Sequence, residues 1–319
     1  MIKRFFLAPS TGEPLAFFRI AIALLGLVQG GWLIGSIAML YGPDGLIPWS
    51  VSSGIVDPYM PQLSWLKPLS QLTGASATAL VYVLMGTYLC SLGALLIGKF
   101  TRYAAFIAWA IQFTFINTGF MGAYGVETFM HIALFYCIIM PVGEVFAWDK
   151  LSLSTKPVES EWNTLSLRVL QIHLCVVYVA SGAEKAMGIQ WWNGEAIWQT
   201  LMQGQFARFD MRWMANYPLF AKLLCWSTLL LETGYPFFIW WRRSRPYGYV
   251  AIVLLHASIA IFMGLQLFST IMIIFNTTAF GWPYLKQAYY SLVHPLRERK
   301  KLHRAGMLAT QAFSHEFEM

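Results

Sequence analysis

The feature that most constrains this chain is a series of about eight apolar stretches, each close to the roughly 20 residues that a helix needs to cross a hydrocarbon core. They lie at about Pro14–Tyr41, Ser76–Gly98, Arg102–Phe120, Thr128–Trp148, Ser166–Met187, Leu219–Trp241, Gly248–Gly264 and Gln266–Gly281. Only 12% of the 319 residues are charged, whereas soluble domains carry about 25%. The sequence therefore predicts an all-α fold, a polytopic membrane helix bundle.

The positive charges predict how this bundle is oriented. With an even number of spans, both chain ends share one side of the membrane with the connections after the second, fourth and sixth spans. Most basic residues fall on that side: Lys3, Arg4, Lys99, Arg102, Lys150, Lys156, Arg168, Arg242, Arg243, Arg245, Lys286, Arg297, Arg299, Lys300, Lys301 and Arg304. The other side holds Lys67, Arg208 and Arg212. Because Lys and Arg concentrate in cytoplasmic connections, we expect cytoplasmic N- and C-termini.

The same pattern predicts domain organisation and surroundings. We expect a transmembrane domain over residues 1–283 and a basic cytoplasmic tail over residues 284–319. The first apolar run is too long for a signal peptide, so we expect it to remain as a span. The net charge of +7 favours anionic headgroups and gives no sign of nucleic-acid binding. The expected partner is the lipid bilayer around a multi-pass integral membrane protein, in the plasma (inner) membrane if the source is bacterial.

Lys185 is the first candidate functional residue, because it lies near the end of the fifth span, just before the tryptophan-rich stretch GIQWWNGEAIW. A lysine at the bilayer centre costs about 2.5–3.5 kcal/mol, so an ionisable group in a span indicates function. Tyr178, Ser181 and Gly182 precede it by seven, four and three residues and share its helix face. Position alone leaves two interpretations, since Lys185 could also extend its ammonium group to the headgroups.

Four further ionisable residues lie in the expected spans. Glu127 and His131 form an i, i+4 pair at the start of the fourth span, and Glu232 and His256 lie near mid-membrane in the sixth and seventh. Because such groups avoid lipid, we expect them to converge with Lys185 inside the bundle. Glu232 could instead pair with His256 in a structural network. No metal-binding spacing such as H-E-x-x-H occurs, so no metal site is expected.

Three other features carry structural expectations. Arg19 either extends to the cytoplasmic surface or pairs with a buried acid. His173 is expected to be a hydrogen-bonded packing residue. The connection over residues 188–218 contains a short amphipathic helix through Glu195–Phe206, which is either an interfacial anchor or a lid over a cavity that opens to the lipid.

Four stretches then carry a family resemblance: APSTGEPLAFFRIAIALL, YGPDGLIP, YVASGAEKAMGIQWWNGEAIW and LLLETGYPFFIWWRRSRPYGYVAIVLLHASIAIFMGLQLFSTIMI. In this order they resemble the HTTM (horizontally transferred transmembrane) domain of the vitamin K-dependent gamma-carboxylase family. In those enzymes a reduced vitamin K reacts with oxygen to give an epoxide and a strong base. That base removes a proton from a substrate glutamate, which then captures carbon dioxide. The lysine of the matching motif, which acts as the first base, aligns with Lys185.

The resemblance implies a membrane-embedded enzyme, a quinol-dependent oxygenase (epoxidase) or carboxylase (lyase), that modifies a peptide or protein substrate at the outer membrane face. Its cofactor would be reduced vitamin K or menaquinol, a lipid-soluble quinone, with O2 and CO2 as co-substrates. The residues expected to be catalytic are Lys185, Glu127, His131 and His256; those expected to bind the cofactor are Tyr178, Gly182 and Glu232.

Two departures from the family limit this expectation. Glu127 aligns with a family histidine that protonates the carbanion, and only a short segment follows the last span. Quinol handling is therefore expected more firmly than glutamate carboxylation. The alternative is a non-catalytic membrane factor for maturation or export of a secreted peptide. A transporter is the third hypothesis, and the sequence shows no inverted repeat in its support.

Overall fold

The computed structural model describes residues 2–151 and 159–292, and the regular secondary structure in these two ranges is helical. One isolated β-bridge joins Ser10 to Ser160. The all-α prediction is therefore confirmed for this part of the chain. Lys156 lies outside the described residues, and so does the part of the expected tail that follows residue 292.

The elements up to residue 151 are α1 (Ile2–Leu7), α2 (Glu13–Leu33), η1 (Ile34–Ser36), α3 (Ile37–Tyr41), α4 (Trp49–Ile55), η2 (Leu63–Trp65), α5 (Leu66–Thr73), α6 (Ala77–Ile97), α7 (Thr101–Thr118), η3 (Phe120–Gly122), α8 (Gly125–Ile139) and α9 (Trp148–Leu151). Those that follow are α10 (Glu161–Met187), α11 (Ile189–Asn193), α12 (Glu195–Met202), η4 (Arg212–Asn216), α13 (Pro218–Thr233), α14 (Tyr235–Trp240), α15 (Arg245–Met263), α16 (Gln266–Asn276) and the π-helical turn η5 (Thr277–Gly281).

Each expected span contains helix, but only part of the set is long and apolar enough to cross a membrane. In the described part of the chain, 4 helices meet that requirement: Glu13–Tyr41, α6, α10 and α15. The helices α7, α8, α13 and α16 occupy the remaining expected spans and are shorter or less uniformly apolar. An apolar helical membrane protein is thus supported. A count of about eight spans and cytoplasmic termini stay predictions.

Proline accounts for two of the differences between the expected spans and the observed helices. The span expected to reach Trp148 is wrong after Ile139, where α8 ends. Pro141 disfavours helical backbone at Met140, which is extended with φ −85 and ψ 154. The span expected over 219–241 is divided into α13 and α14, because Pro236 has no N–H to continue the helical bonding of the preceding turn.

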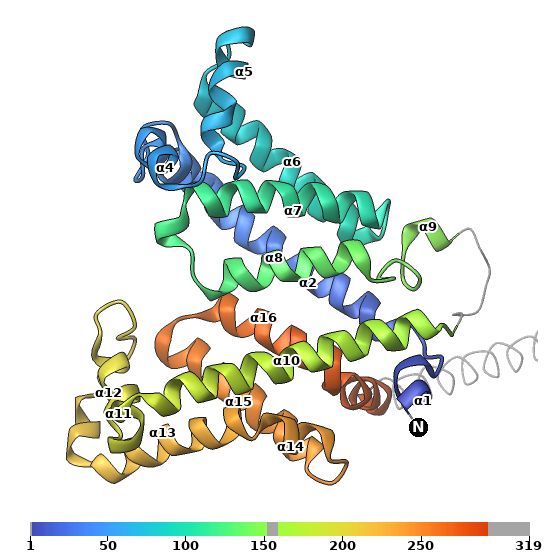
Figure 1. Ribbon diagram of the computed structural model, residues 1–319, viewed down its shortest axis with the longest axis vertical. Helices are drawn as coiled ribbons and strands as arrows, with labels where there is room; N and C mark the ends of the chain where they lie inside the picture. Colours follow the sequence, from blue (N-terminus) through green and yellow to red (C-terminus); the bar gives the residue numbers. More distant parts are fainter. Residues whose placement is uncertain (1, 152–158, 293–319) are drawn as a thin grey trace, which may run out of the picture.

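The long helices form two groups (Figure 1). In the first helix group, α2 packs against α6 and α8, and α7 packs against α6 and α8. In the second helix group, α10 packs against α13 and α14, and α15 packs against α13 and α14. The helix α16 contacts α2 and α8 on one side and α10 and α15 on the other. Residues of the two groups therefore meet mainly through α16.

The two ends of the helix bundle differ in their basic residues. Figure 1 shows α1, α9 and the turn between α6 and α7 at one end, with α4, α5, α11 and α12 at the opposite end. Lys3, Arg4, Lys99 and Lys150 belong to the first end, whereas Lys67 lies on α5 at the other. The fold thus gathers on one end basic residues that the sequence predicts to share a membrane side.

Small residues allow α2 and α6 to approach closely in the first helix group. A Cβ atom added at Gly26 would lie 2.9 Å from Leu92 Cδ1, and one added at Gly30 would lie 2.7 Å from Leu89 Cδ2. Glycines four residues apart permit such close helix contacts in membranes. The side chain of Gln29, next to Gly30, reaches α8, where its Nε2 donates to Glu127 Oε1.

Arg19 has a different role from either of those expected. Its side chain is fully buried and donates from Nη1 to the carbonyl oxygens of Leu95 (2.7 Å) and Leu96 (3.2 Å). Its Nη2 donates to the carbonyl oxygen of Phe146 at 2.6 Å. The expectation of a surface-reaching or acid-paired arginine is therefore wrong. Arg19 instead ties α2 to the C-terminal end of α6 and to the loop after α8.

Candidate functional site

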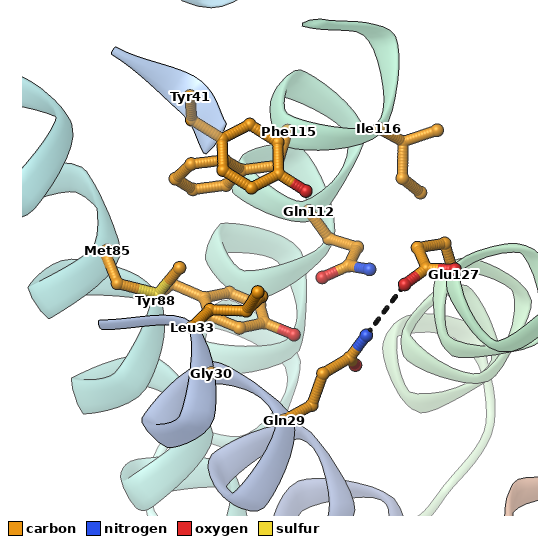
Figure 2. A pocket seen from close by; sticks show the side chains of 10 residues that line it. All are labelled: Gln29, Gly30, Leu33, Tyr41, Met85, Tyr88, Gln112, Phe115, Ile116 and Glu127. Carbon is orange, nitrogen blue, oxygen red and sulfur yellow. Dashed lines mark hydrogen bonds between the residues drawn. The ribbon is translucent and has the colours of Figure 1, made fainter. Parts of the chain in front are cut away.

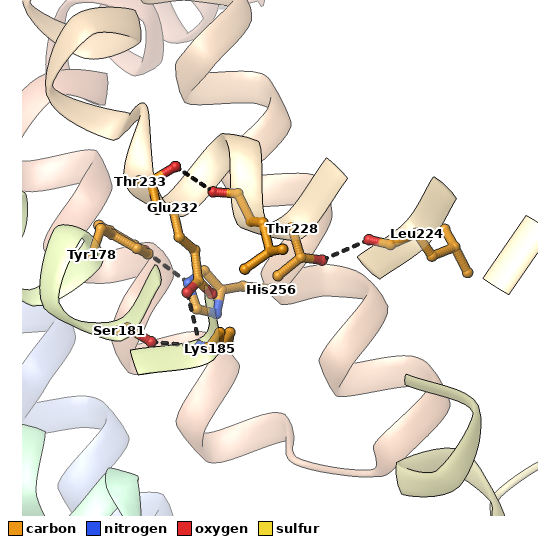
Figure 3. A network of polar contacts seen from close by, with 9 residues as sticks. Tyr178, Ser181, Lys185, Leu224, Thr228, Glu232, Thr233 and His256 are labelled. Carbon is orange, nitrogen blue, oxygen red and sulfur yellow. Dashed lines mark hydrogen bonds and ion pairs between the residues drawn. The ribbon is translucent and has the colours of Figure 1, made fainter. Parts of the chain in front are cut away.

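Lys185 lies at the contact between α10 and α13, where it meets a carboxylate (Figure 3). Its Nζ is 2.8 Å from Glu232 Oε2 and donates to Ser181 Oγ at 2.5 Å. The side chain of Lys185 is 25% exposed, whereas that of Glu232 is 9% exposed. The pair thus has one partner inside the bundle and one that can be reached from its surface.

Gly182 explains why the two helices come close enough for this pair. It is buried, and a Cβ atom added to it would lie 2.8 Å from the backbone nitrogen of Thr233 and 3.1 Å from Glu232 Cβ. Any side chain here would push α13 away from α10, since real Cβ atoms do not approach backbone that closely. Gly182 therefore sets the distance between Lys185 and Glu232. Its expected part in cofactor binding stays a prediction.

Replacing Gly182 with alanine is expected to lower the thermal unfolding temperature. Forcing one methyl group into a filled helix contact typically costs about 1–3 kcal/mol. Unfolding of the purified protein in detergent, followed by tryptophan fluorescence, measures the effect. Gly86→Ala on α6 is the matched control, because no atom lies within 4 Å of its added Cβ. Equal unfolding temperatures for the Gly182→Ala and Gly86→Ala variants would contradict the packing role.

A buried hydrogen-bonded chain links α10 to α14, α15 and α16. Tyr235 donates to Asn276 Oδ1 (2.7 Å), and Asn276 Nδ2 donates to Tyr178 Oη (2.8 Å) and to the carbonyl oxygen of Met272 (2.8 Å). Tyr178 Oη also lies 2.8 Å from His256 Nε2, and the tautomer of His256 decides which of the two groups donates. The chain thus links four buried side chains: Tyr235, Asn276, Tyr178 and His256.

The suggested pairing of Glu232 with His256 is thus replaced by two separate contacts. Glu232 bonds Lys185, and His256 bonds Tyr178 (Figure 3). His256 Nδ1 is buried and has no hydrogen-bond partner among the described residues. The structure accordingly brings together four sequence-predicted site residues, namely Lys185, Glu232, Tyr178 and His256.

The connection after α10 also reaches Lys185. The ring of Trp191, on α11, lies 5.6 Å from Lys185 Nζ, within the range of a cation–π contact. The amphipathic helix expected through residue 206 is observed as α12 and ends at Met202. Leu201 and Met214 of this connection pack against Ala221 of α13. The segment is therefore anchored on α13 next to the site.

Glu127 and His131 belong to the first helix group and lie apart from Lys185. Glu127 lies in the first turn of α8. Its Oε2 accepts from the backbone N–H of Tyr124 (3.0 Å), and its Oε1 accepts from Gln29 Nε2 (3.0 Å) (Figure 2). The ring of His131 stacks on that of Trp109, with centroids 5.0 Å apart. The expected convergence of all these groups with Lys185 is therefore not observed. Their proposed catalytic roles stay predictions.

Several other expectations can be placed on the structure. His173 Nδ1 lies 2.8 Å from Tyr136 Oη, which confirms it as a hydrogen-bonded packing residue. Among the described residues, no group of three or more His, Cys, Asp and Glu side chains could hold a metal ion. Glu184 is exposed, on a different face of α10 from Lys185.

Sequence reasoning missed the two residues that complete the buried chain, Asn276 and Tyr235. Both are buried, with 0% and 1% exposure. The signal for Asn276 was available, because it is an amide inside the apolar run IMIIFNTTAF, and a polar group in such a run needs a partner. Which partner it finds depends on the helix arrangement.

One comparison identifies the type of domain. The family model described as HTTM domain matches residues 13–282 of this chain. No curated protein matches, and no solved structure matches. The matched range includes the Lys185–Glu232 pair, the buried chain, Gln29 and Glu127.

Proposed function

The chain belongs to the HTTM domain family, and from that premise we propose that it is a membrane-embedded enzyme that uses a reduced quinone and oxygen to modify a substrate at the outer membrane face. The domain is one found in vitamin K-dependent carboxylase-like membrane proteins. Lys185 is the proposed base. The protein would act as a multi-pass membrane enzyme on a peptide or protein substrate.

The observation that carries this proposal is the partly exposed amine bonded to a more buried carboxylate. Lys185 Nζ can accept a proton from a bound hydroxyl group only after it has released one. Glu232 Oε2, 2.8 Å away, is positioned to receive that proton. Ser181 Oγ holds Nζ at 2.5 Å. The three groups together provide a proton acceptor with a second site to which the proton can move.

The surroundings of Lys185 fit an aromatic ring that carries a hydroxyl group. Trp191 offers a flat face beside Nζ, and Met187, Ile189 and Trp192 are exposed at 82%, 73% and 49%. An apolar surface with one polar point suits a lipid-soluble ring. When bound, a reduced quinone would supply the electrons and the oxygen-reactive carbon atoms. Tyr178, seven residues before Lys185 on α10, contacts His256 inside the bundle.

A second function, a non-catalytic factor for maturation or export of a secreted peptide, is favoured by the same ion pair. A lysine held by both a carboxylate and a hydroxyl group also serves as a structural link between α10 and α13. In that case, the pair would stabilise the bundle without exchanging protons. The two functions differ in whether the protein consumes a quinol.

The test is turnover of a reduced quinone by the purified protein. Menaquinol and vitamin K hydroquinone are incubated with oxygen and the full chain in lipid nanodiscs, and the quinone products are analysed by mass spectrometry. We expect a product that has gained one oxygen atom, the epoxide, above the level in protein-free nanodiscs. Absence of this product with both quinols would overturn the enzymatic proposal and favour the maturation factor.

A further inference from the structure

The first helix group contains a small cavity, lined by both polar and apolar side chains, that is separate from Lys185. It has a volume of about 30 Å³ and lies between α2, α3, α6, α7 and α8, large enough for an ion or for one or two water molecules. Figure 2 shows oxygen-bearing side chains turned toward this space. They are Gln29, Tyr41, Tyr88, Gln112 and Glu127.

Two of these side chains lack a partner although they are buried. Gln29 is 8% exposed and Tyr88 is 4% exposed. Gln29 Oε1 and Tyr88 Oη have no hydrogen-bond partner among the described residues. A buried polar atom without a partner costs about 1–3 kcal/mol. Two such atoms lining one cavity therefore indicate that the cavity holds a species that contacts oxygen.

The charge of the cavity narrows the identity of that species. Gln29 already donates its Nε2 to Glu127 Oε1, so its own Oε1 remains available as an acceptor. No Lys, Arg or His nitrogen in the described ranges forms a salt bridge with Glu127. The cavity thus presents one carboxylate with neutral amide and phenol oxygens. Oxygen ligands of this kind suit hard cations.

We propose that this cavity binds one alkali-metal cation, Na⁺ or K⁺, with Glu127, Gln29 and Tyr88 as ligands. A single positive charge balances the single carboxylate. A divalent ion would leave an uncompensated charge in surroundings of low polarity, which is costly. The site lies in a different helix group from Lys185, so the inference does not depend on the proposed quinol chemistry.

The experiment measures thermal unfolding of the full chain in nanodiscs at constant ionic strength, while choline chloride is replaced stepwise by NaCl or by KCl. A ligand that binds only the folded state raises the unfolding temperature with its concentration. We expect a rise of several degrees with one or both alkali cations, and the difference between the two series identifies the preferred ion.

Three variants test whether the rise in unfolding temperature comes from a cation bound in this cavity. Glu127→Gln is expected to abolish it, and Tyr88→Phe, which removes only one hydroxyl group, is expected to shift the half-saturating cation concentration upward by about tenfold. The rise should persist in Glu195→Gln, whose carboxylate is exposed at the start of α12 in the other part of the bundle. If Glu127→Gln does not fold, the Tyr88→Phe titration alone decides.

Three outcomes would overturn the proposal. One is an identical unfolding temperature in sodium, potassium and choline chloride, as expected for a cavity that holds only water. Another is dependence on pH without dependence on cation, as expected for a protonated Glu127. The third is a rise that Tyr88→Phe leaves unchanged, as expected for nonspecific salt binding.

Discussion

Replacing Lys185 with methionine is expected to reduce epoxide formation from a reduced quinone by at least about 100-fold, the lower range for loss of a positioned general base. Methionine keeps much of the length of the side chain and removes the amine. Ser181 and Glu232 then remain without the group that both of them contact. The initial rate of epoxide formation from the reduced quinone by the purified variant in nanodiscs is the measurement.

Two further variants test whether Lys185 acts by transferring a proton, by its positive charge or by supporting the folded structure. Lys185→Arg keeps a cation beside Glu232 but does not release a proton near neutral pH, so it should be as inactive as Lys185→Met. Lys185→Met leaves a carboxylate of 9% exposure unpaired, and the double variant with Glu232→Gln relieves this cost. If Lys185→Arg retained turnover, the amine would be acting through its charge and the base assignment would fall.

A second lysine that contacts a tryptophan ring provides the control. Lys222 lies on α13, and its Nζ is 5.0 Å from the ring centroid of Trp226. It resembles Lys185 in its contact with a tryptophan but forms no salt bridge within the described residues. Lys222→Met should therefore turn over quinol at the rate of the unmodified protein.

The parts of this site that the sequence predicted follow from the geometry of one helix. Ser181 precedes Lys185 by four residues, and the helical repeat alone places the two on one face. The bond from Lys185 Nζ to Ser181 Oγ confirms that prediction. The positions of the helices were similarly accessible, because apolar length is a local property of the chain.

The contact between Lys185 and Glu232 could not be predicted from the geometry of one helix. The two residues are 47 positions apart, and their pairing depends on how closely α13 approaches α10 at Gly182. The separation of Glu127 from Lys185 depends on α16, which lies between the two helix groups (Figure 1). Hydropathy and charge locate spans along the chain, but they do not specify which spans are neighbours.

Replacing Arg19 with methionine is expected to produce the largest loss of stability, about 3 kcal/mol. The variant removes the donor from the partly buried carbonyl groups of Leu96 and Phe146, and a carbonyl group left without a partner away from water costs about 1–3 kcal/mol. Leu95 loses less, because its carbonyl oxygen also accepts from the amide of Gly98 at 3.2 Å. Denaturation of the purified protein in detergent, compared with the unmodified chain, measures the change.

Controls for Arg19 must distinguish buried hydrogen bonding from general loss of a positive charge. Arg102→Met removes an exposed arginine near the same end of the bundle, and it should change stability by less than about 0.5 kcal/mol. Arg19→Lys retains the charge but offers one nitrogen in place of the forked guanidinium, so an intermediate loss is expected. A full recovery with lysine would mean that charge near the C-terminal end of α6 is sufficient. The bonds from Nη1 to α6 and from Nη2 to the loop after α8 predict otherwise, because a single ammonium group cannot reach both segments with the same geometry.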